Sequence, residues 1–328
     1  MGLEISHINC KNIDKEKWDC CINEDWEGQA YGLSWYLDIV SPGWEALILL
    51  DVQGNYDTVM PLPVRKQFWI AYLQQPFFCQ QLGVFGKRAT DHEVLEAFLQ
   101  KLRKLFNYVI DYTFSSRFSG QAQSFPTYAI TYYLDLNRPY LEIQKGYTRD
   151  RKLNLGRGFK SGLKVIKSRD LEPLLQIFQQ HTSHKIYGGV SEDAYEQLRD
   201  LYSAFIERDL AKLFYTHDGD GNILTGGLFL IYKNKIIYLF NASTPAGKKS
   251  NGNTLILDHV IQDFSNQPYI LDFESPAEEF ASITQFYASF GSEKQILPQL
   301  QYDELPFMLK LGKSIRRKVK LSLKSALG

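Results

Sequence analysis

Two carboxylates in the last third of the chain have the residue types and the spacing needed for proton transfer. Asp272 and Glu274 come at the end of a predicted strand, Tyr269–Phe273, and strand alternation directs both side chains to one side. A carboxylate in that place can take a proton from a nitrogen nucleophile, directly or through water. The same pattern also occurs where charges close a strand in solvent or cap the next helix. Asp272 and Glu274 are therefore candidate catalytic bases.

Tyr287 is the matching candidate for a general acid. It lies in a predicted helix, Ser282–Phe290, and its hydroxyl could protonate a leaving group there. Tyr287 also shares an apolar helix face with Phe286 and Phe290, which is typical of a buried core. Both interpretations stay open at this point.

A polar loop that contains glycine precedes these residues and has the features of an anion site. It follows the buried strand Ile236–Phe240 and leads into an apolar helical pattern that begins at Thr254. Free backbone N–H groups and the helix dipole point the same way at a helix N-terminus, which suits a phosphate. The residues predicted to hold it are Lys249, Ser250, Asn251, Gly252, Asn253 and Thr254. The alternative is an ordinary strand-to-helix connection in which Thr254 is a simple N-cap.

A second polar segment, Gln74–Gly86, lies in the first half of the chain and is irregular, aromatic and rich in amides. Its side chains could line an acceptor cleft between domains, because binding clefts combine apolar walls with a few polar groups. The residues concerned are Gln75, Phe77, Phe78, Gln80 and Gln81. Buried amides that brace a turn would give the same sequence pattern.

The elements that must position these residues follow a similar order in both halves. Each half is predicted to contain helices, an antiparallel meander, a further helix and a further strand. Asn137-Arg138-Pro139 is the best boundary, because a strand ends there and a basic helical stretch begins. We therefore expect an α/β (α+β) protein with two domains, 1–137 and 138–305, followed by a tail, 306–328.

From Ala211 onward this order resembles the GNAT acyltransferase superfamily. Tyr287 and Gly291 match its Tyr-x-x-x-Gly-Phe pattern, although Ser292 replaces the final Phe. The nearest counterpart of its Gln/Arg-x-x-Gly-x-Gly/Ala cofactor loop is Lys249–Thr254, which differs at the first and last positions. The resemblance implies that the loop binds coenzyme A and that acyl-CoA is the co-substrate of an N-acyltransferase.

The tandem halves are similar to the Fem-type branch of that superfamily. The basic helix start Tyr147–Asn154 and the run Leu271–Ser275 before the last helix carry this likeness. Proteins of that branch have two GNAT-like domains in tandem, each a mixed, mainly antiparallel sheet flanked by helices, and transfer amino acids from aminoacyl-tRNA to peptidoglycan precursors. The likeness implies a small-molecule or lipid-linked amine of the cell envelope as acceptor. A neutral chain argues against tRNA as donor, since tRNA binding needs a broad basic surface.

Composition bounds the class of protein and its location. The 328 residues are 44% hydrophobic and 23% charged, which is enough for a large core, and their net charge is zero. The N-terminal residues have no secretory-signal pattern and no run of 18 apolar residues occurs, so we expect a cytoplasmic protein. The four cysteines have no zinc-ligand spacing, so we expect reduced thiols and no metal.

The neutral total hides a basic C-terminus. Residues 306–328 contain seven Lys or Arg and no acid, which leaves 30 basic against 37 acidic residues before them. Apolar residues recur there every three or four positions, so a helix would be apolar on one side and basic on the other. Such a helix could dock on the acidic body, contact an anionic membrane at its inner face, or bind nucleic acid.

Three classes of function stay open on the sequence. The first is an N-acyltransferase that uses acyl-CoA, and the second is a Fem-type aminoacyltransferase that uses charged tRNA. The third is a noncatalytic tandem GNAT scaffold that binds a ligand, which the imperfect cofactor loop would favour.

Overall fold

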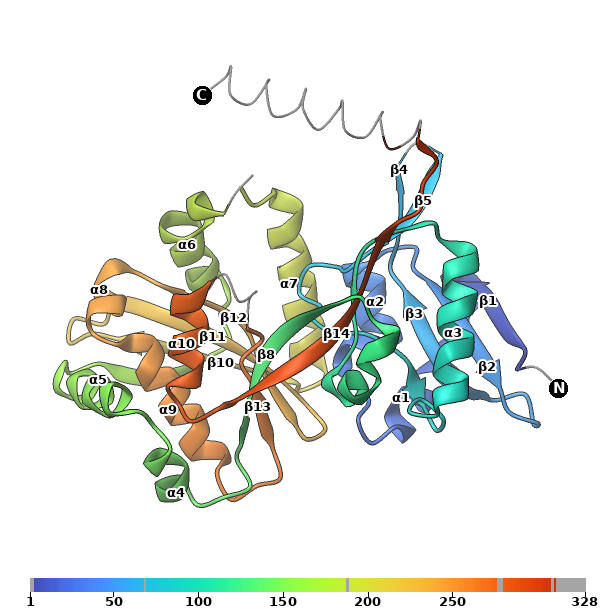
Figure 1. The fold of residues 1–328 in the computed structure, drawn as a ribbon. Coiled ribbons are helices and arrows are strands. Elements are labelled where there is room, and N and C mark those ends of the chain that lie inside the picture. The colour runs from blue at the N-terminus through green and yellow to red at the C-terminus, as the bar shows by residue number, and fades with distance from the viewer. Residues whose placement is uncertain (1–2, 68, 187–188, 276–279, 308–309, 311–328) are drawn as a thin grey trace.

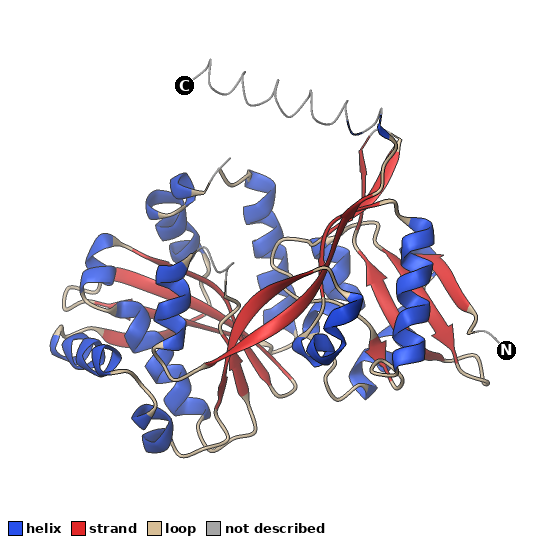
Figure 2. Ribbon diagram, in the orientation of Figure 1, coloured by secondary structure: helices blue, strands red, loops and turns tan. Residues whose placement is uncertain are grey.

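The chain folds into two halves that share one large sheet (Figure 1). The computed structural model describes residues 3–67, 69–186, 189–275, 280–307 and 310. Figure 2 shows strands running through the middle of both halves with helices on either side. The first half contains, in chain order, β1 (Ile5–Asn9), η1 (Cys10–Asn12), α1 (Lys15–Glu24), η2 (Ala30–Gly32), α2 (Ser34–Val40), β2 (Glu45–Leu50), β3 (Tyr56–Leu62), β4 (Val64–Gln67), β5 (Ile70–Gln74), β6 (Phe85–Gly86), α3 (His92–Leu105), β7 (Tyr108–Thr113), η3 (Ser116–Ser124) and β8 (Thr127–Asp135).

The second half begins with helices and ends with a long strand. Its elements are α4 (Tyr140–Lys145), α5 (Arg149–Lys160), β9 (Lys164–Ser168), α6 (Glu172–His181), η4 (Ser183–Lys185), α7 (Glu192–Glu207), β10 (Ala211–His217), β11 (Ile223–Tyr232), β12 (Lys235–Ser243), α8 (Pro245–Lys249), α9 (Gly252–Phe264), β13 (Ile270–Asp272), α10 (Ala281–Ala288) and β14 (Glu293–Asp303).

The ten-stranded sheet joins the two halves edge to edge. Its order is β4-β5-β7-β14-β8-β13-β12-β11-β10-β9, and a smaller sheet of the first half has the order β1-β2-β3-β6. The last strand, β14, lies between β7 and β8 of the first half, with Ile296 opposite Ile130. On its other side β8 pairs with β13 of the second half, with Leu134 opposite Leu271. The halves are therefore joined by backbone hydrogen bonds as well as by side chains.

Two neighbouring strands of the second half diverge. β12 and β13 run parallel and pair over three positions only, from Lys235 with Ile270 to Ile237 with Asp272. β13 then ends, whereas β12 continues to Ser243. The sheet splits at this point, and α10 follows beside the split.

The strands β10 to β12 are covered on both faces. α6 packs on β11 and β12 from one side, and α9 packs on β10 and β11 from the other. Alternation along β12 fits this arrangement, because Ile237 belongs to the larger apolar core shared with the first half while Ile236 belongs to a second core under α5 and α9.

The sequence predictions for helices and strands were correct in kind but incomplete. The predicted glycine loop contains a short helix, α8, and the following helix begins at Gly252 and not at Thr254. The strands β1, β4, β6, β9 and β14 were not predicted. Pro298 makes β14 hard to predict as a strand, because a proline lacks the backbone N–H that a central strand needs. It is tolerated because pairing with β7 begins only at Gln299. The basic tail lies outside the described residues, apart from residues 306, 307 and 310.

Candidate active site

A pocket of about 530 Å³ lies beside the split in the sheet, between β12 and α10. Its walls are formed by the end of β12, the α8–α9 region, one face of α10 and the start of α5. The lining residues are Arg151, Asn154, Thr182, Tyr238, Asn241, Ser243, Lys248, Asn251, Gly252, Asn253, Thr254, Ser282, Ile283, Phe286 and Tyr287. This set contains two cations, several amides and hydroxyls, and no acid. A pocket of that composition suits an anionic ligand with an apolar part.

A β-bulge in β12 turns its polar end toward the pocket. The register with β11 shifts between Leu228 and Phe229, which leaves Leu239 as the additional residue. In a regular strand, residues three apart face opposite sides. The extra residue of the bulge places the side chains of Tyr238 and Asn241 on the same side of β12, and both line the pocket.

The helix α8 and the start of α9 approach the sheet so closely that one residue in each must be glycine. A Cβ on Gly252 would lie 2.3 Å from Thr225 Oγ1, and one on Gly247 would lie 2.3 Å from the Leu224 carbonyl oxygen. Asn251, in the left-handed region at φ 59°, begins α9 without a side-chain cap. Both glycines thus have a packing reason, and the alternative in which Thr254 is the N-cap of the helix is wrong, because Asn251 takes that position.

Of the six predicted loop residues, four line the pocket: Asn251, Gly252, Asn253 and Thr254. Lys249 and Ser250 do not, and Lys248 lies there in their stead. At the floor of the same region, the buried hydroxyls of Thr216, Thr225 and Ser243 have no hydrogen-bond partner, and Ser243 faces the pocket. Unpartnered buried hydroxyls are uncommon, and they favour a place that receives a polar ligand or water.

Arg151 is the buried cation of the pocket. It is 6% exposed, donates from Nε to Ser289 Oγ at 2.8 Å and from Nη1 to Thr254, and its guanidinium lies 4.2 Å from the ring centroid of Phe286. Within the described ranges no carboxylate pairs with it. Burial lowers the pKa of the guanidinium to about 10, so it stays charged at neutral pH. A buried cation without an anion is costly unless a ligand supplies the charge.

Tyr287 lies on the pocket wall formed by α10. Its ring stacks on Phe273 at 4.9 Å, and its hydroxyl is hydrogen-bonded to the side chain of Asn241. Burial, followed by the nearby Glu274, raises the pKa of Tyr287, so the hydroxyl stays protonated and can donate. The two interpretations of the sequence are thus compatible, because Tyr287 is packed in the second core and also reaches the pocket.

Glu274 lies where the second half meets the first. β13 has already ended, and Glu274 takes a left-handed conformation with φ 47°, so the strand alternation used to orient it does not apply. Its Oε1 accepts a hydrogen bond from the Tyr31 hydroxyl at 2.7 Å, and the backbone N–H of Gln80 also donates to it. Burial raises the pKa of Glu274 to about 8, which is close to the working range of a general base.

Asp272 holds Glu274 in place. Its Oδ1 accepts from Thr131 Oγ1 at 2.6 Å and from the backbone N–H of Glu274 at 2.9 Å, while its Oδ2 accepts from Gln81 Nε2 at 3.0 Å. Burial raises the pKa of Asp272, but both oxygens are engaged inside the protein. Of the two carboxylates, Glu274 therefore stays the candidate base, and neither of them lines the pocket.

The predicted acceptor residues are mostly bracing groups. Gln81 is buried between Asp272 and Gln29, and Gln80 donates to the Ser275 carbonyl at 2.8 Å. The other three predicted residues make different contacts. Gln75 Nε2 donates to the Cys79 carbonyl at 2.8 Å, Phe78 packs against Phe240, and Phe77 is 71% exposed. The alternative interpretation of this loop, amides that brace a turn, fits Gln75 and Gln81.

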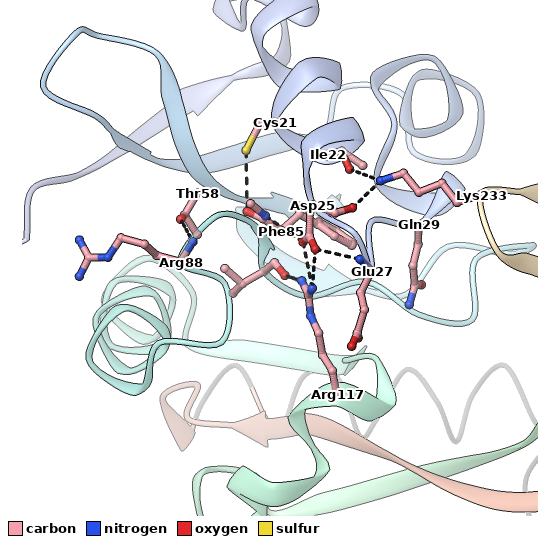
Figure 3. Close-up of polar contacts among 12 residues, drawn as sticks. Cys21, Ile22, Asp25, Glu27, Gln29, Thr58, Phe85, Arg88, Arg117 and Lys233 are labelled. Atoms are coloured by element: carbon pink, nitrogen blue, oxygen red, sulfur yellow. Dashed lines mark hydrogen bonds and ion pairs between the residues drawn. The ribbon is translucent and has the colours of Figure 1, made fainter. Parts of the chain in front are cut away.

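The segment between α1 and α2, which carries Tyr31, is fixed at its start by buried charges (Figure 3). The Asp25 carboxylate accepts from Arg117 Nη1 at 2.9 Å, and both side chains are almost fully buried. Lys233, from the β11–β12 turn of the second half, donates to the carbonyls of Ile22, Asn23 and Asp25 at the end of α1. A cation is favourable at a helix C-terminus. These contacts set the position from which Tyr31 reaches Glu274.

Known structures share this architecture, although no family model and no curated protein matches the chain. FemX aligns over 92% of this chain and 98% of its own, with a TM-score of 0.63 and 12% identity. The chain has the tandem GNAT-like fold. The C-terminal domain of a protein assigned as a lysylphosphatidylglycerol synthetase from Agrobacterium fabrum covers 87% of the chain and 90% of its own length, with a TM-score of 0.54 and 12% identity. The L-PGS of Bacillus licheniformis gives 0.50 and 11% identity over 92% and 96%.

The resemblance stated from the sequence is therefore confirmed at the level of the fold. In the described part of the chain, no group of three or more His, Cys, Asp or Glu is arranged to hold a metal ion. Among the same residues, no helix has the length and apolar character needed to cross a bilayer.

Proposed function

We propose that this protein is an N-acyltransferase that takes an acyl group from acyl-CoA and transfers it to an amine. The observation that carries the proposal is the pocket at the start of α9, which is lined by both Tyr287 and the buried Arg151, a cation with no carboxylate partner among the described residues. A pyrophosphate would supply an anionic partner for Arg151. Lys248 and the first backbone N–H groups of α9 would bind the same pyrophosphate.

The residues divide the chemistry as amine acylation requires. The amine nitrogen attacks the thioester carbon and forms the C–N bond, and Glu274 takes the proton that the nitrogen loses, directly or through water. The C–S bond then breaks, and Tyr287 donates its proton to the departing thiolate, so that amide and thiol are the products. Asp272 keeps Glu274 in place throughout. After burial, the charge of Glu274 is the next cause that raises the pKa of Tyr287, which supports placing the proposed base near the proposed acid.

Coenzyme A binding tests the proposal directly. We expect coenzyme A to raise the melting temperature of the protein, and acyl-CoA species that bind should release thiol when amines are added. Lys248→Ala should weaken binding by about three- to tenfold, since one charged hydrogen bond is lost. Lys249→Ala is the matched control, because Lys249 is as exposed as its neighbour but does not line the pocket.

If both lysine variants bound coenzyme A equally well, a phosphate site at this end of the pocket would be excluded. If coenzyme A neither bound nor raised the melting temperature, the acyl-CoA donor would be excluded. A noncatalytic scaffold would then be favoured only if charged tRNA also failed to bind.

A Fem-type aminoacyltransferase is the second candidate, and the extent of the likeness to FemX favours it. The terminal phosphates of a charged tRNA could use the same cations. In that case the aminoacyl group would leave from a ribose oxygen and Tyr287 would protonate that oxygen. Transfer of a labelled amino acid from charged tRNA to a lipid-linked amine, without added coenzyme A, would support this candidate. We propose a small-molecule or cell-envelope amine as acceptor in either case.

A further inference from the structure

The segment 145–169, which contains α5 and most of β9, is strongly basic. It carries nine of the 30 basic residues of 1–305 and only one of their 37 acids, Asp150. Asp150 lies in the first turn of α5, where the helix dipole favours an acid. Arg151 is buried in the pocket, and the other eight cations of the segment are exposed.

These eight exposed cations have no acidic partners. In the described part of the chain, no ion pair joins any of them to a carboxylate. Lys152 Nζ donates to the Lys145 carbonyl at 2.9 Å, and Arg157 Nη1 donates to Asn154 Oδ1 at 3.1 Å, so both acceptors are neutral. Their positive charge is therefore not cancelled by ion pairs within the protein.

The helix α5 presents four of these cations on one face. Its other face is fixed against α9, because Leu155 is buried and a Cβ on Gly158 would lie 2.9 Å from Leu255 Cγ. At 3.6 residues per turn, the exposed side chains fall on the opposite half of the helix. Figure 1 shows α5 at the edge of the second half, away from the first half. The cations on this exposed half are Arg149, Lys152, Arg157 and Lys160.

Two large apolar side chains are exposed among these cations. Leu153 is 51% exposed and Phe159 is 63% exposed. Leu153 has Arg149 four residues before it and Arg157 four residues after it, and such neighbours lie side by side on a helix. A solvated helix face gains nothing in stability from exposed rings and branched carbon chains, so this combination favours a surface that is both anionic and partly apolar.

The strand β9 extends the same surface. It is an edge strand of the large sheet and, like α5, packs on α9. Its exposed side chains include Lys164, Lys167 and Ile166. We call the six cations of α5 and β9, together with Leu153, Phe159 and Ile166, the basic face.

We propose that the basic face docks on an anionic lipid bilayer. Its cations would lie among the headgroups, and Leu153 and Phe159 would enter the boundary between headgroups and acyl chains. An RNA would also attract the cations, but its phosphate backbone offers no apolar contact to an aliphatic side chain such as Leu153. The apolar residues therefore favour the bilayer.

The same helix connects the basic face with the pocket. Arg151 and Asn154 line the pocket, and Arg157 of the basic face donates to Asn154. Docking would thus bring this wall of the pocket close to the membrane surface, where a lipid-linked amine would be found. That consequence rests on the proposed function, whereas the docking itself needs no catalysis and can be measured without it.

Vesicle sedimentation tests the proposal. The full-length protein is mixed with phosphatidylcholine vesicles that contain phosphatidylglycerol, and separately with pure phosphatidylcholine vesicles. We expect binding to the anionic vesicles, with a marked decrease at high salt because exposed charges are screened. The double substitution Lys152→Glu and Lys160→Glu should weaken this binding roughly thirtyfold or more, since two surface cations are lost and two anions are gained.

The double substitution Lys11→Glu and Lys104→Glu is the matched control. It changes the net charge by the same amount at two exposed lysines of the first half, which form no ion pair with the described residues. This control should bind anionic vesicles as the unchanged protein does. Every sample retains residues 306–328, so any binding by that segment is common to all of them.

A second pair of variants tests the apolar contact. Phe159→Ala should weaken binding to anionic vesicles roughly tenfold, since much of the contact area of one ring is lost. Trp26→Ala should not, because Trp26 is an exposed ring of the first half, 74% accessible, that lies outside the basic face. All four variants change exposed side chains and should melt at the temperature of the unchanged protein. Equal binding by the two lysine variants, equal binding to both kinds of vesicle, or binding to RNA but to no vesicle would each overturn the proposal.

Discussion

At the scale of single residues, Glu274 is the point at which the proposed chemistry can be measured. Its pKa is raised to about 8, chiefly by burial, so the carboxylate form that accepts a proton grows as the pH approaches that value. We expect kcat/KM to rise with pH and to level off above about 8. Glu274→Gln should remove this rise and lower the rate by about 10²- to 10⁴-fold. A pH profile that is unchanged in the variant would assign the titration to the amine substrate.

The same substitution should have the opposite effect on stability. Between the unfolded pKa of 4.5 and the folded pKa of about 8, Glu274 is protonated in the folded protein and ionised in the unfolded one. Unfolding therefore releases a proton, and the free energy of unfolding falls as the pH rises through this window. Glutamine does not titrate. We expect Glu274→Gln to melt at a higher temperature than the unchanged protein above pH 8, with the difference shrinking as the pH falls toward 4.5.

Tyr287 makes a separate prediction. Tyr287→Phe keeps the ring that stacks on Phe273 and removes only the hydroxyl. Because that hydroxyl is the proposed acid, turnover should fall by about 10²-fold or more while coenzyme A binding stays within about twofold. The measurement is steady-state thiol release together with the melting-temperature shift. Full turnover in the variant would end the assignment and leave Tyr287 as a core residue.

Where a local pattern existed, the sequence singled out residues that the structure brings together. Tyr287 and the loop residues Asn251 to Thr254 were found from their spacing and their resemblance to a known pattern, and they do line one pocket. Arg151 was predicted only as part of a basic stretch. Nothing in a helix sequence separates a buried arginine from a solvated one, because its burial depends on Phe286 and Phe290, far along the chain.

At the scale of elements, the segment between α1 and α2 connects the first half to the candidate base. Tyr31→Phe removes the donor that stabilises the Glu274 carboxylate, so the pKa of Glu274 should rise further and the midpoint of the pH-rate profile should move upward. Tyr232→Phe is the control, because it also removes a tyrosine hydrogen bond between the halves, to Asn23, but away from Glu274. The same shift in both variants would contradict a positioning role for Tyr31.

Element prediction failed where tertiary contacts decide the outcome. β14 has a proline in its middle and weak alternation, so it forms a strand only because β7 and β8 leave a place between them. Conversely, the polar glycine loop was predicted in the right place between a strand and a helix, but the short helix α8 inside it depends on the Thr244 cap and on the close packing of Gly247. The order of strand, glycine loop and helix is set by local sequence and could be predicted. The pairing partners of each strand are set by residues far along the chain and could not.

At the scale of the whole molecule, the boundary near residue 137 is a prediction that the shared sheet makes testable. A fragment of residues 1–137 lacks β14, so β7 and β8 lose the strand that pairs with both. We expect this fragment to unfold without a cooperative transition, and a mixture with residues 138–328 to recover one. Calorimetry of each fragment and of the mixture is the measurement. A cooperative transition of the isolated fragment would show that the first half is an independent domain.

The position of β14 also bears on how the protein is made. A ribosome releases the first half long before it has added residue 303, and until then the space between β7 and β8 stays open and two strand edges are unpaired. Because nascent chains fold from the N-terminus, this half must wait, exposed to aggregation or to a chaperone, for a strand that begins only at Glu293. A chain that stops early would therefore leave its first half unfinished as well as its second.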